Sequence, residues 1–252
     1  MKAHFLKADN NPAESAEAMA KSSSGEPVLD DSANAVASEL TEDQALALLK
    51  RSDVTAADLA LLGRNPSAIK SRKVLLALAT HPRTPRHITI PMLRRLFTFD
   101  LMQVALAPTV AADVKRAAEE QILNRLESLS SGERISLARR ASGRVAAALL
   151  LDAEIRVVST ALDNSRLVEA LVVTALMKRN PPESLFALVS EHRKWSLRRE
   201  VQLALLRSET LPLDRAIELA RNFSAEFLRE IVPEPRLATL VQSNSSLSGD
   251  QE

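Results

Sequence analysis

The residue types that most often perform catalysis occur in this chain without the spacing that catalysis needs. There is no cysteine, which excludes a disulfide framework, a thiolate metal site and a cysteine nucleophile. No serine stands in the glycine-flanked elbow of the hydrolases, and we expect residues 130–133 to form a turn and a helix N-cap instead. The glycines, which are too scattered for a phosphate-binding loop or a dinucleotide fingerprint, are Gly25, Gly63, Gly132, Gly143 and Gly249.

The four histidines do not have the spacing of a metal site. No two of them stand four residues apart on a helix, and none belongs to an HExxH motif. His81 and His87 lie in the proline-containing stretch HPRTPRH, where we expect turn residues exposed to solvent. Adjacent carboxylates such as Glu119 and Glu120 are typical of a solvated helix face. The sequence therefore predicts no catalytic residue, no metal and no cofactor.

Pairs of basic residues recur along the chain and form the main candidate binding surface. In stacked helical repeats such pairs would line up as a positive stripe that attracts nucleic acid, an acidic protein segment or anionic lipid. The alternative is that they are solvated charges near helix ends, with stems that cover apolar edges. The pairs are Arg94 with Arg95, Lys115 with Arg116, Arg139 with Arg140, Lys178 with Arg179, Arg193 with Lys194, and Arg198 with Arg199.

Trp195, the single tryptophan, lies among basic residues in the stretch EHRKWSLRREVQ and belongs to the same candidate surface. A tryptophan beside arginine and lysine could stack on a base or receive a peptide. The alternative is that the ring packs between two helices.

The charge of the chain is unevenly distributed. The first 46 residues hold three Lys and nine Asp or Glu, and residues 241–252 hold two acidic residues and no basic one. The stretch between them has 30 basic and 21 acidic residues, although the net charge of the whole chain is only +1. We expect residues 1–40 to be a disordered acidic tail and residues 241–252 a second disordered tail. Residues 41–240 are then the folded domain.

The elements of this domain are predicted to be short helices with almost no strand. Aromatic residues are only 3% of the chain, whereas Ala and Leu are abundant. Thr41 with Gln44 and Thr55 with Asp58 have the spacing of capping boxes that open helices. Apolar residues at three- and four-residue steps predict one amphipathic helix over residues 110–129.

A recurring phrase places helix ends along the chain. In each copy an apolar segment with Ala-Leu precedes a short polar stretch, often with Asn, His or Pro, and then another helix. Asn180 would be one such N-cap, with Glu183 in the first turn. Spacings of 16 and 26 residues predict a degenerate array with units of roughly 20–45 residues. The copies are LALLGRNPSAI, LLALATHPRTP, QVALAPTVA, STALDNSRLV, TALMKRNPPES and LALLRSETLPL.

The stretches LATHPRTP and ALMKRNPPESLFALV resemble the bacterial leucine-rich repeat variant pattern, and the whole is similar to HEAT-like solenoids. The resemblance covers about residues 55–215, although most copies lack the full Asn-Pro-x-Thr-Pro-like turn, and the chain has none of the cysteines of the iron–sulfur member. It implies an irregular right-handed α-solenoid of short helices that binds partners and performs no chemistry.

Three functions follow as hypotheses. The first is a non-catalytic scaffold that binds a protein or peptide through its concave face. The second is a binder of nucleic acid or another polyanion that uses the basic stripe, with the acidic N-terminal tail as a competitor. The third, a HEAT-like DNA glycosylase, is disfavoured because a chain with one Trp and no Tyr has few rings to hold an extruded base. No small-molecule substrate is evident. The longest apolar run, residues 145–151, is too short to span a bilayer, and we expect a cytoplasmic protein.

Overall fold

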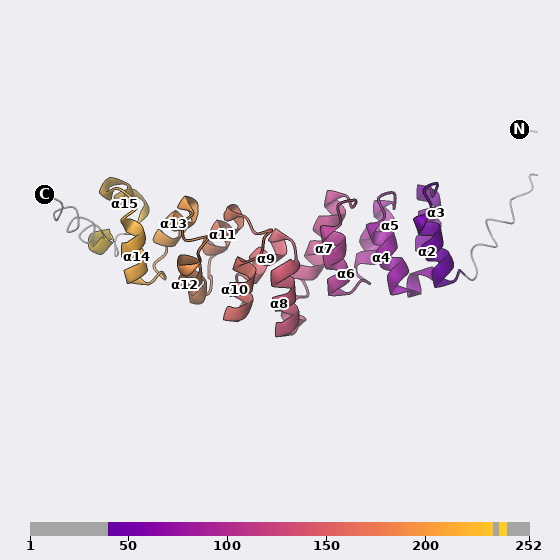
Figure 1. Ribbon diagram of the computed structural model, residues 1–252, viewed down its shortest axis with the longest axis horizontal. Helices are drawn as coiled ribbons and strands as arrows, with labels where there is room; N and C mark the ends of the chain where they lie inside the picture. The colour runs from indigo at the N-terminus through magenta and orange to yellow at the C-terminus, as the bar shows by residue number, and fades with distance from the viewer. Residues whose placement is uncertain (1–39, 234–236, 241–252) are drawn as a thin grey trace, which may run out of the picture. The chain divides into compact units, whose positions relative to one another are not determined.

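The computed structural model describes residues 40–233 and 237–240, and in this part of the chain all regular structure is helical (Figure 1). No residue of these ranges lies in a β-strand, so the predicted all-α class is confirmed. None of the helices described is both long enough and apolar enough to span a bilayer. The tails predicted at residues 1–40 and 241–252 lie outside the described residues, apart from Leu40.

The helices are short, seven to twelve residues for those of α type. In chain order they are α2 (Glu42–Lys50), α3 (Ala56–Arg64), η1 (Ala68–Lys70), α4 (Arg72–Thr80), α5 (Arg86–Leu93), α6 (Thr98–Leu106), α7 (Ala112–Leu123), η2 (Leu126–Ser128), α8 (Ser131–Arg140), α9 (Gly143–Leu149), α10 (Ile155–Leu162), α11 (Glu169–Leu176), α12 (Glu183–Glu191), α13 (Arg199–Leu206), α14 (Leu213–Ala220) and α15 (Ala225–Ile231).

Capping boxes begin three of these helices. The hydroxyl of Thr41 accepts from the backbone N–H of Gln44 at the start of α2, and Thr55 does the same with Asp58 at the start of α3. Both predicted boxes are therefore confirmed. Ser130 starts α8 in the same way, as the turn and N-cap predicted for residues 130–133. The hydrogen bond from its hydroxyl lowers the pKa of the Glu133 carboxyl.

Two predicted helix boundaries are wrong. The helix expected over residues 110–129 is α7 followed by the separate 3-10 turn η2. The guanidinium of Arg125, between them, donates to the carbonyls of Arg94 and Leu96, which fixes the chain in a turn there. The N-cap of α12 is Pro182, not Asn180. A residue that precedes proline is disfavoured in a helix, so Pro181 cannot start α12 and the first helical residue is Glu183.

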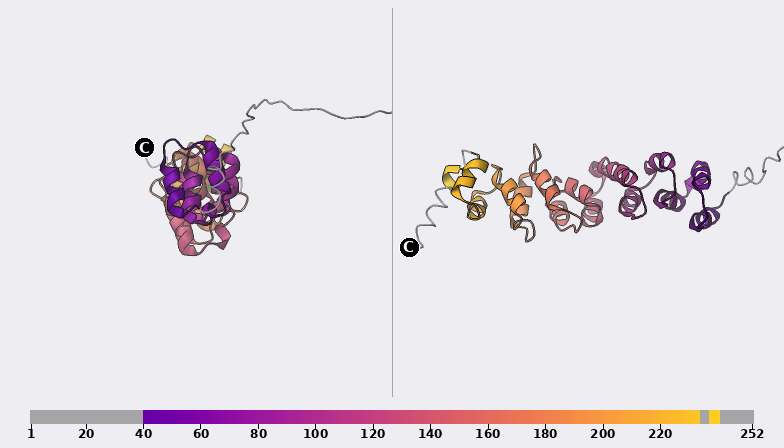
Figure 2. Two further views of the ribbon diagram at one scale, coloured as in Figure 1. Left: turned by 90° about the vertical axis from the view of Figure 1, so that its right-hand side faces the viewer. Right: turned by 90° about the horizontal axis from the view of Figure 1, so that it is seen from above.

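Helices that are close in the chain order pack on one another. Contacts between consecutive helices include α4 with α5, α6 with α7, α8 with α9 and α12 with α13. Contacts between helices that are next but one include α2 with α4, α4 with α6, α8 with α10 and α10 with α12 among the even-numbered ones, and α5 with α7, α7 with α9, α9 with α11 and α11 with α13 among the odd-numbered ones. Figures 1 and 2 show the helices following one another in this order from α2 (indigo) to α15 (yellow). The even helices begin 24 to 33 residues apart, which is the length of one helix pair with its turns.

The core consists mainly of leucine, valine and alanine side chains between the two series of helices. Few large aromatic residues contribute; Trp195 and Phe186 are the largest fully buried side chains. The buried polar side chains include Asn164 and Asp100, each 1–2% exposed. Asp100 accepts two hydrogen bonds from the guanidinium of Arg72, at 2.7 and 2.8 Å, so that α6 is joined to α4. Buried polar groups of this kind are expected to be paired.

Candidate interaction surface

The turns of this fold are of two kinds, and the basic pairs are divided between them. Even-to-odd turns join an even-numbered helix to the following odd-numbered one, and odd-to-even turns join an odd-numbered helix to the next even-numbered one. Three of the six pairs lie in or beside even-to-odd turns: Arg139 with Arg140, Arg193 with Lys194, and Arg198 with Arg199; Lys115 and Arg116 lie inside α7. The other two pairs, Arg94 with Arg95 and Lys178 with Arg179, lie in odd-to-even turns.

Side-chain hydrogen bonds join three successive even-to-odd turns. The turn after α12 is joined to the turn after α10, and the turn after α10 is joined to the turn after α8. The indole N–H of Trp195 donates to the carbonyl of Leu162, the last residue of α10, at 2.8 Å. The amide of Asn164 donates to Ala138 and Ala141 at the end of α8, at 2.7 and 3.2 Å. The last carbonyls of a helix lack partners within the helix, so donors from the next pair satisfy them.

The earlier even-to-odd turns are joined in the same way. The guanidinium of Arg83 donates to the carbonyls of Ser52 and Val54 after α2, and the hydroxyl of Thr109 donates to Thr80 at the end of α4. The donor and acceptor in these links, as in those of Trp195 and Asn164, are 23 to 33 residues apart in the chain. The even-to-odd turns after α2, α4 and α6 are therefore neighbours in space, and so are those after α8, α10 and α12.

Three cations of the candidate surface have partners within the fold. Arg95 donates to the carbonyl of Ile69 at 2.9 Å, the Lys194 ammonium lies 3.9 Å from the centre of the Trp195 ring, and the guanidinium of Arg199 lies over Phe223. The charged groups of these three residues are therefore engaged inside the fold. Among the described residues, no hydrogen bond or ion pair engages the charged groups of Arg94, Lys115, Arg116, Arg139, Arg140, Lys178, Arg179, Arg193 and Arg198.

Trp195 does not belong to the binding surface that the sequence suggested. Its side chain is only 1% exposed, and its indole N–H is used within the fold. The ring lies beneath Lys194 and cannot stack on an external base. Of the two interpretations left open by the sequence, packing between helices is the one observed.

Two exposed apolar side chains on these turns were missed by the sequence analysis. Leu197 is 77% exposed in the turn after α12, and Val168 is 54% exposed in the turn after α10. A leucine inside the basic turn stretch of residues 192–199 was the only signal. With the free cations of the turns after α8 and α12 they form a surface that we call the turn patch: Arg139, Arg140, Val168, Arg193, Leu197 and Arg198.

The charge of the turn patch is positive after the neighbouring carboxylates are counted. Asp163 lies beside it with one oxygen 3.3 Å from the Nε2 of His192. Glu169 is the first residue of α11, and Glu200 is the second residue of α13, at the same turns. Against these three carboxylates stand the four cations of the patch, together with Arg166, whose guanidinium donates to the carbonyl of Arg140 at 3.3 Å. Lys194 and Arg199 add two further positive charges.

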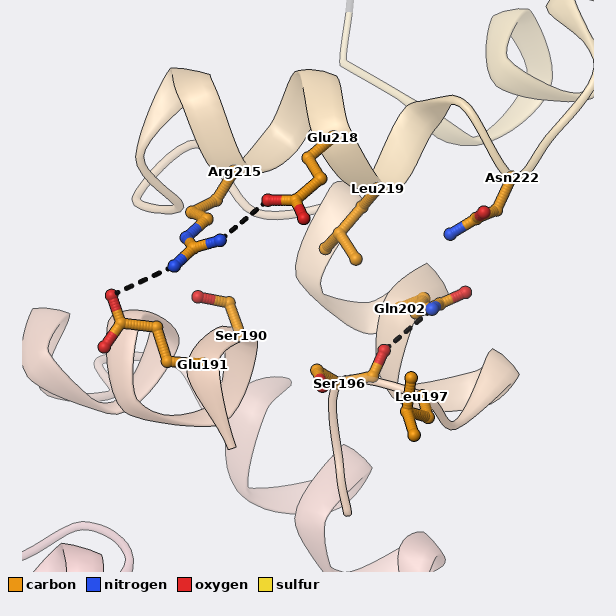
Figure 3. Close-up of a pocket in the computed structure, with 9 residues that line it drawn as sticks. All are labelled: Ser190, Glu191, Ser196, Leu197, Gln202, Arg215, Glu218, Leu219 and Asn222. Carbon is orange, nitrogen blue, oxygen red and sulfur yellow. Dashed lines mark hydrogen bonds and ion pairs between the residues drawn. The ribbon is translucent and has the colours of Figure 1, made fainter. Parts of the chain in front are cut away.

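A small pocket adjoins the patch at Leu197 and lies between α12, α13 and α14 (Figure 3). Its volume is about 270 Å³, below the roughly 300–1,000 Å³ of pockets that hold small molecules. Arg215 bridges Glu191 and Glu218 across it, at 3.6 and 2.7 Å, and the hydrogen bond to Glu218 raises the pKa of Arg215. Leu219 and the amide of Asn222 complete the side nearest α14.

The structure gives the histidines in the turns a local role. The Nδ1 of His81 accepts from the backbone N–H of Arg83 at 3.2 Å, and the Nδ1 of His192 accepts from that of Lys194 at 3.2 Å. Burial, and then the nearby charge of Arg83, lower the pKa of His81. Within the described residues, no group of three or more His, Asp or Glu side chains could hold a metal ion.

Comparison of the chain with protein-family models, curated proteins and solved structures finds no match.

Proposed function

We propose that this chain is a non-catalytic helical-repeat scaffold, an irregular right-handed α-solenoid, that binds a protein or peptide partner. The observation that carries the proposal is the turn patch, where the exposed Leu197 and Val168 adjoin the unpaired cations of the turns after α8 and α12. Protein interfaces combine an apolar core with a polar rim, and Leu197, at 77% exposure among arginines, offers both kinds of group. We also propose a cytoplasmic location.

The test is selection of random peptides displayed on phage against the full-length chain, with a helical protein of similar charge as the control target. We expect peptides that are enriched only on this chain and that bind it saturably in solution by fluorescence anisotropy. If no peptide is enriched over the control target, the proposed function is contradicted.

A second candidate is binding of nucleic acid or another polyanion, with the acidic residues 1–40 as a competitor. The observation in its favour is that three of the six basic pairs lie at even-to-odd turns. This candidate requires binding to random DNA or RNA that is detectable at low salt and weakens as salt is added, because phosphate neutralisation releases counterions. Binding that is absent at low salt, or insensitive to salt, excludes it. Deletion of residues 1–40 should strengthen such binding, and an unchanged affinity would exclude the competing role of the tail.

A further inference from the structure

We infer that the turn patch binds an acidic segment of another protein that carries an apolar side chain, with the apolar side chain against Leu197 and the carboxylates on Arg193 and Arg198. This inference rests on the proposed function and names the chemistry of its partner. It is carried by the arrangement of charged and apolar groups on the three turns after α8, α10 and α12.

The cations of the turn patch are the first feature that supports an acidic partner. Arg193 and Arg198 stand on either side of Leu197 in one turn, are exposed, and make no ion pair within the described residues. Arg139 and Arg140 are equally exposed at the end of α8. Guanidinium groups bind carboxylates through two parallel hydrogen bonds, so a row of them without internal partners is suited to several carboxylates on one chain.

The three turns of the patch lie close together. The guanidinium of Arg166 donates to the carbonyl of Arg140, and the indole of Trp195 donates to Leu162. These contacts hold the three turns next to one another, so that an extended segment lying across them meets the unpaired cations of the turns after α8 and α12, with Arg166 in the turn between them. The apolar side chains Val168 and Leu197 lie on two of the same turns.

The side chains of the turn patch favour a peptide over a nucleic acid. Single-stranded nucleic acids bind through base stacking on aromatic rings in addition to phosphate contacts. The only tryptophan is buried beneath Lys194, and no aromatic side chain belongs to the turn patch. Phosphates would leave Leu197 without an apolar partner, whereas an amphipathic peptide uses both kinds of group. The pocket beside Leu197, with Leu219 on its far side, has room for one side chain of such a peptide (Figure 3).

The experiment uses the full-length chain and the peptides selected against it. We expect these peptides to be enriched in Asp and Glu together with Leu, Ile or Phe. The double variant Arg193→Glu/Arg198→Glu should bind them at least about tenfold more weakly, and Leu197→Ser several-fold more weakly, with little change in thermal stability because these side chains are exposed. Added salt should weaken the wild-type complex and have less effect on the charge-reversed variant.

Matched control variants exist on the opposite turns. Met177 is 60% exposed and is followed by the unpaired pair Lys178 and Arg179 between α11 and α12. Met177→Ser and Lys178→Glu/Arg179→Glu repeat the same chemical changes in an odd-to-even turn. Their peptide affinity should equal that of the wild type.

The outcomes separate this inference from the proposed function. If selected peptides are not acidic, or bind the turn-patch variants as tightly as the wild type, the inference is wrong while the scaffold proposal stands. If a single-stranded oligothymidine binds as tightly as the peptides, and Leu197→Ser changes neither affinity, the patch recognises polyanions and the inference is overturned. If no peptide is selected, the scaffold proposal fails and this inference fails with it.

Discussion

At the scale of single residues, side chains that join one helix pair to the next determine which groups are left for a partner. Trp195 donates to Leu162 and Asn164 donates to the end of α8, so both are consumed inside the fold. Arg193 and Arg198 have no such acceptor within the described residues. Whether a donor side chain is used inside the fold or stays available to a partner therefore depends on whether a free carbonyl at a helix end lies within its reach.

Substitution of Trp195 by Phe removes one indole N–H and leaves the carbonyl of Leu162 without its donor. We expect a loss of about 1–3 kcal/mol in the free energy of unfolding, because an unsatisfied buried polar group costs its desolvation. Urea denaturation followed by circular dichroism measures it. Leu197→Ala, at a neighbouring site that is 77% exposed, should change stability by less than about 0.5 kcal/mol. Equal effects of the two variants would contradict the structural role of the indole.

The turn of His81 should weaken in mild acid. The Nδ1 of His81 accepts from the N–H of Arg83 and must lose this bond when it is protonated; burial, followed by Arg83, holds its pKa below the usual value of about 6.5. The unfolded chain then binds more protons, so this contribution to stability is complete above about pH 6.5 and declines as the pH falls below that value.

The variant His81→Asn tests this dependence, because the Oδ1 of an Asn side chain can accept the equivalent hydrogen bond. The Oδ1 of Asn164 accepts such a bond from the backbone N–H of Arg166. Urea midpoints between pH 5 and 7 should fall less steeply for His81→Asn than for the wild type. His87→Asn, at an exposed histidine outside this bond, is the control and should keep the wild-type slope. An unchanged slope in His81→Asn would show that His81 does not contribute to it.

At the scale of the elements, helix ends were more predictable from the sequence than the pairing of helices. All six copies of the recurring phrase end a helix, at Arg64, Thr80, Leu106, Leu162, Leu176 and Leu206. They end both even and odd helices, however, which explains their irregular spacing. A step of 16 residues joins the ends of adjacent helices, such as α3 and α4, whereas the step of 26 joins α4 and α6.

The candidate site was only partly predictable for the same reason. The basic pairs are visible in the sequence, but which of them are free depends on carbonyls that lie 23 to 33 residues away. Arg95 is engaged by Ile69, whereas Arg94 beside it is not. Leu197 was overlooked because its exposure depends on how the turn packs, with Trp195, two residues earlier, buried. The spacing of residues in the sequence does not predict that packing.

The contact between neighbouring turns leads to a test at Gly143, the first residue of α9. A methyl group at this position would overlap the backbone carbonyl of Arg166 in the next even-to-odd turn. Gly143→Ala should therefore destabilise the fold by about 1–3 kcal/mol through overpacking, although alanine favours helices. Thermal and urea unfolding measure the change.

Gly132 in α8 is the matched control, because a methyl group there meets no atom within 4 Å. Gly132→Ala should stabilise the fold by about 0.4–1 kcal/mol, since it reduces the entropy of the unfolded chain. If Gly143→Ala were also stabilising, the close approach of these two turns would be refuted.

At the scale of the whole described region, the contacts are local in the chain order. Helices in substantial contact are neighbours or next but one. The turn patch exists only because two such steps place three separate turns side by side. Stability in this arrangement is expected to be a sum of contributions from each pair and its interfaces, so that a local defect has a local effect.

Native-state hydrogen exchange tests this locality with two buried leucines far apart in the chain. Leu206 in α13 and Leu59 in α3 are 1% and 0% exposed, and truncation of either to alanine should cost about 2–5 kcal/mol. Leu206→Ala should speed amide exchange in α11 to α14 and leave α2 to α4 close to the wild type. Leu59→Ala should give the reverse pattern. A uniform acceleration across all helices in both variants would show one cooperative core, and the separate stacking of helix pairs on which the turn patch depends would be contradicted.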